Sequence, residues 1–321
     1  MIEYKFIYHF PHQMQHIYPC WSLWRHFPNA KHVFLSRPRY HKDFVSGSAF
    51  TKGVQTVLKA NNITTISVRM VDYIRWYRSN PSELLVAYTH RVDGFRAAHD
   101  DDMESLRRNT LTVFGMEQYI ERYCGRAQAR MSSHNQQDTS PISNADSVGD
   151  DASHHAPPSP PRIAIVNRGK TRQMFGMHNI SSMLQHELEL PYRPPVFFLE
   201  DTSFQQQVEA FSNVDILLSP HGAQLTLIPF MPPCSSVIEV IPHGYGHEAY
   251  FGTLAALSGV NHSFIYLGTD MAAETAEMDD REGQVAARNP PVCAPAFRML
   301  QAIRIQYEQW HRCCRFDANT Y

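Results

Sequence analysis

The chain has 321 residues, and 43% of them are hydrophobic, 12% aromatic and 19% charged, a composition that suits a globular protein and argues against wholesale disorder. Because 29 Lys and Arg face 31 Asp and Glu, the formal net charge is only -2, which argues against nucleic acid as a partner. No apolar run is long enough for a membrane span, and the first residues lack the apolar core of a signal peptide.

The N-terminal half, residues 1–124, is predicted to be an α/β domain. Ile17, Trp21 and Trp24 share one helical face, and we interpret the two tryptophans as core residues rather than as a platform for stacking a sugar. A second amphipathic helix is expected around Phe50–Leu58. Three short apolar runs predict strands: His32–Leu35, Ile63–Val68 and Leu84–Tyr88.

The segment 125–161 is predicted to be a disordered linker or insertion. Its main part, residues 131–161, is rich in Ser, Pro and Asp, contains no Lys or Arg, and has almost no apolar side chain to bury. Such a composition does not offset the entropy lost on ordering the chain.

The C-terminal half, residues 162–321, alternates short apolar strands with helices. This alternation predicts a parallel sheet covered on both faces, that is, a Rossmann-like α/β domain. The Ala- and Glu-rich segment Met271–Pro290 is expected to be an exposed loop. The predicted strands are Arg162–Asn167, Val196–Leu199, Asp215–Leu218, Val237–Ile241 and Ser263–Leu267, and the predicted helices follow Met177, Ser203 and Tyr250.

Two loops that leave predicted strands carry candidate binding residues, because ligands of an open parallel sheet bind outside the carboxyl ends of its strands. The loop after the first strand carries Arg168, Lys170 and Arg172, which suit an anion such as phosphate; a solvated surface loop is the alternative. The loop after the third strand carries His221 and Gly222. This His is either a donor to a ligand or a core residue of a tight turn.

Glu239 lies inside the apolar strand Val237–Ile241, where an unpaired carboxylate is costly. It is interpreted as a partner for ribose hydroxyls or as one half of an ion pair with Lys or Arg. No G-x-G-x-x-G or G-x-S-x-G motif is present, which argues against a dinucleotide cofactor and a hydrolase nucleophile. The six cysteines form no C-x-x-C pair and leave the redox compartment open.

The blocks from Ile163 to Gly268 resemble the C-terminal domain of glycosyltransferase family 61, which includes protein N-acetylglucosaminyltransferases and plant pentosyltransferases. The resemblance is carried by His221-Gly222-Ala223-Gln224-Leu225-Thr226, Pro232-Pro233 and Val237–Ile241, with Arg168 and Arg172 upstream. It implies a GT-B-like architecture, with two Rossmann-like domains facing across a cleft.

The resemblance also implies residue roles in an inverting transfer of N-acetylglucosamine or a pentose from a UDP-sugar to a hydroxyl of a glycan or glycoprotein. Arg168 and Arg172 would hold the diphosphate, His221, Gly222, Ala223 and Gln224 would pack against the nucleotide and phosphates, and Glu239 would take the ribose. No divalent metal ion and no other cofactor is expected, because fixed cations stabilise the departing diphosphate. Relatives act in the lumen of the endoplasmic reticulum or Golgi.

Inversion requires a general base. The early segment with His9 and His12 is similar to a family segment in which an acidic residue follows a His four positions later, and here His16 occupies that place. His16 is therefore the candidate base.

The alternative is a non-catalytic protein of the same fold that keeps nucleotide or glycan binding. A metal site at His9, His12 and His16 is disfavoured, since no carboxylate lies nearby. His243, His247 and Glu248 are candidate sugar or acceptor contacts or members of a solvated loop.

Overall fold

The computed structural model describes residues 10–27, 32–36, 48–68, 75, 78–79, 94–95, 97, 99, 101–120, 122–123, 126–127, 160–278 and 281–316. The predicted strand Leu84–Tyr88 and nearly all of the predicted linker lie outside these residues. Among the helices that the structure describes, none combines the length and the apolar composition required to cross a lipid bilayer.

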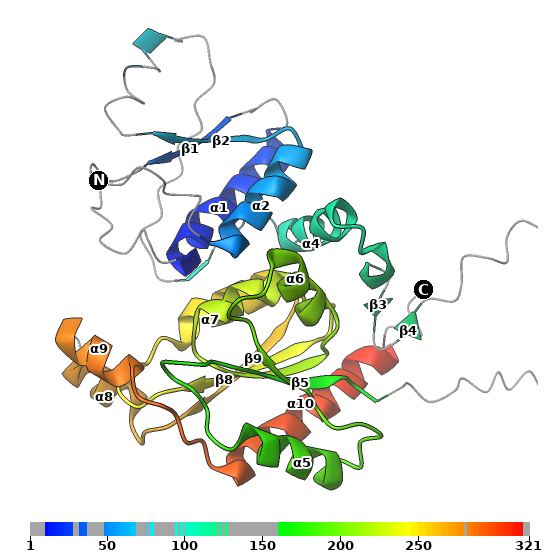
Figure 1. The fold of residues 1–321 in the computed structure, drawn as a ribbon, viewed down its shortest axis with the longest axis vertical. Helices are drawn as coiled ribbons and strands as arrows, with labels where there is room; N and C mark the ends of the chain where they lie inside the picture. The colour runs from blue at the N-terminus through cyan, green and yellow to red at the C-terminus, as the bar shows by residue number, and fades with distance from the viewer. Residues whose placement is uncertain are drawn as a thin grey trace, which may run out of the picture.

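A five-stranded parallel sheet forms the centre of the C-terminal half, as predicted (Figure 1). Its strands alternate side chains between two hydrophobic faces: Val166 and Leu217 belong to one core cluster, and Ile165 and Leu218 to the other. Helices α6 and α7 cover the first face, and α5 and α10 cover the second. The elements are β5 (Ile163–Asn167), α5 (Met177–Glu187), β6 (Val196–Phe198), α6 (Phe204–Ser212), β7 (Ile216–Pro220), β8 (Ser236–Ile241), α7 (Glu248–Leu257), β9 (Asn261–Tyr266) and α10 (Ala296–Phe316).

The strand order, β6-β5-β7-β8-β9, places a topological switch point between β5 and β7. The chain leaves β5 toward one edge of the sheet and returns to build the other side from β7 onward. The loops at the carboxyl ends of these two strands therefore diverge and leave a crevice, which is the usual ligand site of such sheets. Arg168 follows β5 directly and His221 follows β7 directly.

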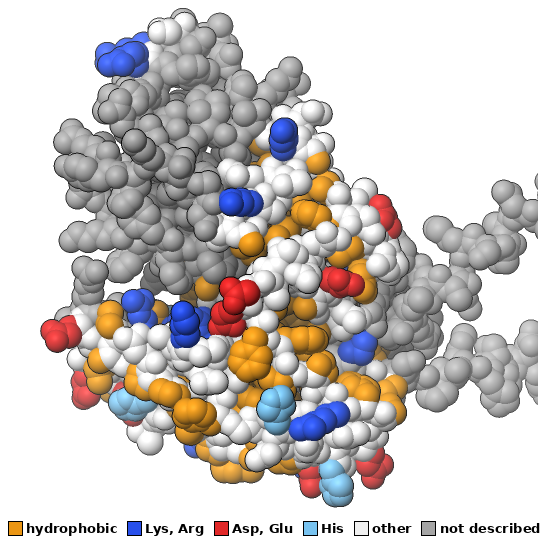
Figure 2. All heavy atoms as spheres, in the orientation of Figure 1, with side chains coloured by type: hydrophobic (Ala, Val, Ile, Leu, Met, Phe, Trp, Pro, Cys, Tyr) orange, Lys and Arg blue, Asp and Glu red, His pale blue; other side chains and the backbone are white. Residues whose placement is uncertain are grey.

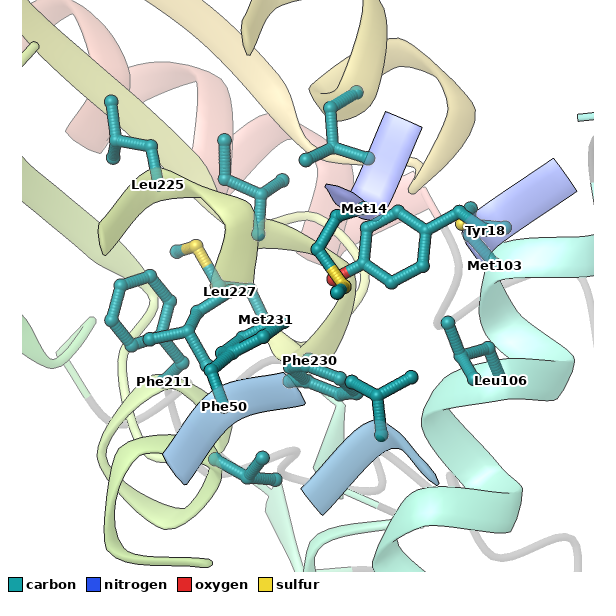
Figure 3. Close-up of a cluster of buried hydrophobic side chains, with 14 of the residues drawn as sticks. Met14, Tyr18, Phe50, Met103, Leu106, Phe211, Leu225, Leu227, Phe230 and Met231 are labelled. Carbon is teal, nitrogen blue, oxygen red and sulfur yellow. The ribbon is translucent and has the colours of Figure 1, made fainter. Parts of the chain in front are cut away.

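The described helices of the N-terminal half pack on the C-terminal half through one continuous core. Helices α1 (Phe10–His26), α2 (Ala49–Ala60) and α4 (Asp102–Val113) contact α6 or the 3₁₀ helix η2 (Ala223–Phe230). Figure 3 shows Met14 and Tyr18 of α1 and Phe50 of α2 in this core, beside Phe230 of η2. The Tyr18 hydroxyl donates to the carbonyl oxygen of Thr226 at 2.7 Å.

Trp21 is buried in the same cluster and Trp24 packs against it, which confirms their interpretation as core residues. The predicted strands near His32 and Ile63 are present as β1 (His32–Ser36) and β2 (Thr64–Val68), and they pair in parallel. Three short elements follow α4: η1 (Glu117–Tyr119), β3 (Arg122–Tyr123) and β4 (Arg126–Ala127).

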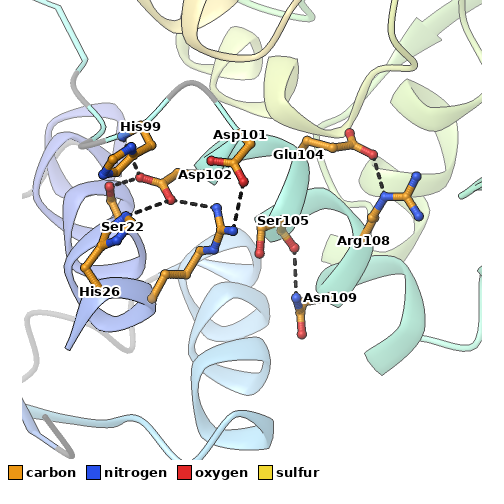
Figure 4. Close-up of polar contacts among 10 residues, drawn as sticks. Ser22, His26, His99, Asp101, Asp102, Glu104, Ser105, Arg108 and Asn109 are labelled. Atoms are coloured by element: carbon orange, nitrogen blue, oxygen red, sulfur yellow. Dashed lines mark hydrogen bonds and ion pairs between the residues drawn. The ribbon is translucent and has the colours of Figure 1, made fainter. Parts of the chain in front are cut away.

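A buried carboxylate joins α1 to the start of α4 (Figure 4). Asp102 is fully buried, and it accepts hydrogen bonds from the Ser22 hydroxyl, from the His99 backbone N–H at 3.0 Å and from Arg25 Nη1 at 2.8 Å. Burial alone would raise the pKa of Asp102, but the hydrogen bonds and the Arg25 charge lower it overall. The ionised carboxylate therefore ties these helices together.

The prediction of an exposed loop at Met271–Pro290 is wrong. This segment forms the helices α8 (Met271–Glu277) and α9 (Arg281–Arg288), and the side chain of Asp270 caps α8 by accepting a hydrogen bond from the Ala273 N–H at 3.0 Å. Ala, Glu and Arg are strong helix formers, so their polarity here marks exposed helices rather than a loop.

A disulfide between Cys234 and Cys313 attaches α10 to the loop that precedes β8, with their Cα atoms 5.9 Å apart. The sequence did not predict this pair, because 79 residues separate the two cysteines. Cys234 packs with Trp310 and Cys314 in a small buried cluster. Disulfides of this kind persist in oxidising compartments.

Candidate functional site

The loop after β5 is held in shape by one buried amide. Asn167 Nδ2 donates to the carbonyl oxygen of Met174 at 2.9 Å, and its Oδ1 accepts from the Met174 N–H at 2.8 Å and from the Arg168 N–H at 2.9 Å. The side chain thus closes residues 168–173 into a fixed loop. This loop carries both arginines that the sequence predicted.

Arg168 links this loop to the one that follows β7. Its Nη1 donates to Gln224 Oε1 at 2.9 Å and its Nε donates to the Thr171 carbonyl at 2.8 Å. Gln224 in turn donates to the Pro220 carbonyl at 2.6 Å. The structure therefore brings Arg168 and Gln224, both candidate binding residues, together across the switch point. Burial lowers the pKa of Arg168, and the charge of Glu200 opposes that effect.

Arg172 is a buried cation, 6% exposed, for which the described residues provide no carboxylate partner. Its Nε makes no hydrogen bond there, and its guanidinium lies 5.9 Å from the centre of the Tyr245 ring. Burial, together with the charge of Arg168, lowers the pKa of Arg172 to about 10, so it remains charged at neutral pH. Its φ of 57° is a conformation that favours glycine. A buried charge without a counter-ion is costly, and an anionic ligand would remove that cost.

Glu239 has two histidine partners. His221 Nδ1 lies 2.5 Å from its Oε1 and His262 Nε2 lies 2.8 Å from its Oε2. Because the carboxylate is 0% exposed, the structure does not support the direct ribose contact expected for Glu239, nor the alternative of a pair with Lys or Arg. The residue instead fixes His221, which also packs against Tyr245 and Phe251 with ring centres 5.0 and 5.3 Å away.

Gly222 is required for space rather than for backbone conformation, since its φ of 166° is extended. A Cβ atom there would lie 2.3 Å from Arg168 Nη1 and 2.6 Å from Gln224 Oε1. Ala223 and Gln224, the residues that follow, begin η2, whose first N–H groups border the loop. The glycine thus lets the Arg168 guanidinium lie directly against the backbone at the carboxyl end of β7.

If these loops hold a diphosphate, as the family resemblance implies, Gly222→Ala should weaken its binding, because the added methyl group displaces the Arg168 guanidinium. Loss of one charge-assisted hydrogen bond corresponds to about 1.5–3 kcal/mol, or roughly 10- to 100-fold in affinity, measured by titration calorimetry. Gly169→Ala is the matched control on the neighbouring loop, since its Cβ would meet only Glu200 at 3.8 Å. Equal affinity in both variants would contradict this role of Gly222.

The remaining predicted site residues occupy different surroundings. The ring of His247 lies 4.6 Å from that of Tyr245, next to the arginine and histidine cluster, and Glu248 begins α7 beside it. His243 is exposed and faces α8, with Nε2 3.3 Å from Glu274 Oε2. His16 lies in α1, but its side chain is outside the described part of the chain, so its role stays a prediction.

A hollow of about 430 Å³ lies beside His243 rather than between the arginines. One side of the hollow is formed by Pro242 and Leu267, at the carboxyl ends of β8 and β9. The other side is formed by residues of α9 and of the segment after it. On the face seen in Figure 2, Lys and Arg side chains alternate with Asp and Glu side chains, which agrees with the small net charge. The candidate anion site thus depends on two individual cations, the buried Arg172 and the half-buried Arg168.

Sequence reasoning missed three residues of this site: Asn167, Tyr245 and His262. Tyr245 stands between Arg172 and His221 and contacts both. Its position between Gly244 and Gly246 was the available signal, because such a pair lets an aromatic residue project from a loop. Asn167 acts through hydrogen bonds across its own loop, and His262 acts through a contact with the neighbouring strand β8.

Comparison with known proteins supports the resemblance drawn from these loops. The family model described as Glycosyltransferase 61 matches residues 10–238, which include the N-terminal helices, β5–β7 and the start of β8. The protein O-linked-mannose beta-1,4-N-acetylglucosaminyltransferase 2 of Bos taurus is 28% identical over 158 residues, 48% of this chain and 26% of the relative.

Two further relatives carry the same name. That of Homo sapiens is 26% identical over 155 residues, 48% of this chain and 26% of the relative. That of Tetraodon nigroviridis is 31% identical over 105 residues, 32% of this chain and 18% of the relative. The chain therefore matches at most about a quarter of the length of each of these relatives.

Proposed function

Because this chain belongs to the glycosyltransferase 61 family, we propose that it transfers a sugar from a UDP-sugar to a hydroxyl group of a glycan or glycoprotein. The observation that carries the proposal is the pair of guanidinium groups of Arg172, which is buried, and Arg168, which is half-buried; neither forms an ion pair with a carboxylate of the described residues. Arg168 donates to Gln224, and Tyr245 lies between Arg172 and His221. A diphosphate would supply the missing negative charge.

In this proposal the two arginines stabilise the leaving group. As the bond between the sugar and the diphosphate breaks, negative charge develops on the phosphate oxygens, and fixed cations held by the protein need no reorganisation to neutralise it. Arg168, Arg172 and the N–H groups at the start of η2 would supply this stabilisation without a divalent ion. His16 is proposed as the base that takes the proton of the acceptor hydroxyl, with inversion at the anomeric carbon.

The names of the relatives favour N-acetylglucosamine as the transferred sugar and an O-mannosyl protein as the acceptor. A GT-B-like arrangement is proposed for the whole chain. The parallel pair β1 and β2, flanked by α1 and α2, is compatible with an N-terminal Rossmann-like half. The acceptor would then bind mainly against that half.

A panel of nucleotide-sugars tests the proposal. The chain is titrated with UDP, UDP-N-acetylglucosamine and UDP-xylose, and GDP-mannose is the control for recognition of the nucleobase. Release of UDP is then measured with and without an O-mannosyl peptide. UDP release that depends on the peptide supports the transferase. Because His16 stands in place of the family's acidic residue, binding of UDP with neither hydrolysis nor transfer would favour a non-catalytic nucleotide-binding protein. Absence of UDP binding would overturn both functions.

A further inference from the structure

Three side chains, His262, Glu239 and His221, form a continuous hydrogen-bonded row that leads from β9 through β8 to the loop after β7. Glu239 and His262 belong to neighbouring strands: Glu239 is paired with Phe264 and Val237 with His262. Both therefore point to the face of the sheet that α7 covers. The backbone of His221, the third member of the row, is fixed to β8 because its N–H donates to the Val240 carbonyl at 2.8 Å.

The row is built into the fold rather than formed by chance at a surface. Glu239 has no exposed surface, and the side chains of His221 and His262 are 7% and 12% exposed. Helix α7 approaches His262 at Gly252, where a Cβ atom would lie 3.3 Å from Nδ1 of the ring. Although burial alone would raise the pKa of Glu239, the two histidines lower it, so the carboxylate is ionised at neutral pH.

An ionised carboxylate only accepts hydrogen bonds, so each histidine must donate to it. The proton of His221 is then fixed on Nδ1, and Nε2 makes no hydrogen bond within the described chain. A phosphate oxygen at Nε2 would require a second proton on the ring. The charge of the resulting imidazolium would be balanced by Glu239 directly behind it, while Arg168 and Arg172 remain available for the diphosphate.

We propose that Glu239 and His262 are positioning residues for His221: Glu239 fixes its ring with Nδ1 protonated, His262 orients Glu239, and Nε2 of His221 is thereby presented to the diphosphate of the donor. The inference rests on the proposed function for the identity of this ligand. It gives Glu239 a role behind His221 in place of a direct contact with the ribose. It also assigns a function to His262, which is not part of the His-Gly-Ala segment.

The test combines imidazole ¹⁵N NMR of the unliganded protein with UDP titrations of Glu239→Gln, His262→Gln and His262→Phe. We expect the His221 ring of the wild type to be protonated at Nδ1 and to lose this preference in Glu239→Gln. UDP affinity should fall roughly 10- to 100-fold in Glu239→Gln and in His262→Phe, the range for loss of one charge-assisted hydrogen bond. His262→Gln should restore most of the affinity, because its amide can donate to Glu239 as the ring does.

The control is Glu274→Gln, which removes another carboxylate paired with a histidine, His243, away from Arg168 and Arg172. It should bind UDP as the wild type does. If Glu239→Gln does not fold, the two His262 variants and the wild-type NMR spectrum still decide the question. Two results would overturn the inference: wild-type UDP affinity in a folded His262→Phe, or a His221 ring protonated only at Nε2 in the wild type. If the wild type still binds UDP in either case, the proposed function stands.

Discussion

Arg172→Met is expected to lower the affinity for UDP by roughly 10- to 100-fold, the equivalent of about 1.5–3 kcal/mol for a lost charge-assisted contact to phosphate. The same variant should leave the unliganded protein at least as stable as the wild type. Folding places this guanidinium in a buried position beside Arg168, as its lowered pKa of about 10 reflects, and Met keeps much of the apolar stem. Affinity is measured by calorimetry and stability by thermal unfolding without ligand.

The matched control is Arg304→Met, because Arg304 is an exposed residue of α10 paired with Glu187 at 3.0 Å. It removes one positive charge without touching the loops after β5 and β7, and so isolates the effect of the site from that of net charge. A lower melting temperature of Arg172→Met with unchanged UDP affinity would mean that Arg172 is a packing residue for Tyr245. That result would remove the main support for the proposed function.

The sheet could be predicted because each of its strands has a recognisable local sequence pattern. β5, β7 and β8 are buried at every position, so their sequences are short uninterrupted apolar runs, and Pro or Gly near their ends marks the boundaries. The observed ends differ from the predicted ones by at most two residues. From the parallel arrangement it followed that the loops carrying Arg168 and His221 meet at one edge, and the structure brings them together.

The contacts between distant segments were beyond local patterns. Nothing in the spacing of Tyr18 indicates that its hydroxyl reaches the carbonyl of Thr226, 208 residues later. The same holds for Glu239, whose sequence context shows only that a buried acid needs partners and does not reveal that both partners are histidines. For α8 and α9 the local signal was present in the strong helix formers Ala, Glu and Arg, but the low hydrophobicity of the segment was interpreted as a loop.

The shared core also bears on the proposed reaction, because it fixes the position of the N-terminal helices relative to the loops of the C-terminal half. If the phosphates bind at η2 and the acceptor base lies on α1, then the base and the leaving group are held by elements that pack directly on each other. Proximity of this kind is what an enzyme needs to keep reacting groups in a fixed relation. The 3₁₀ helix η2 is therefore structural at its buried side chains and part of the candidate site at its first residues.

Phe204→Ala is expected to be the most destabilising single substitution proposed for this chain, at about 3–5 kcal/mol, the usual range for truncating a buried aromatic residue. Phe204 is 4% exposed and begins α6. Its ring lies 5.1 Å from that of Phe50 in α2 and 5.7 Å from that of Phe230 in η2, and α2 approaches it at Gly53, where no Cβ would fit. The substitution therefore removes one of the central contacts between the N-terminal helices and the C-terminal half.

Because that contact belongs to one continuous core, the loss should appear on both sides of it. Urea unfolding of Phe204→Ala should remain a single transition at lower denaturant concentration, and hydrogen exchange should accelerate in α2 as well as in α6. Phe297→Ala is the control, since that ring is 66% exposed and its removal should have little effect. Faster exchange confined to α2, with the β5–β8 region as protected as in the wild type, would show that the N-terminal helices are a separately folding unit that merely packs on the C-terminal half.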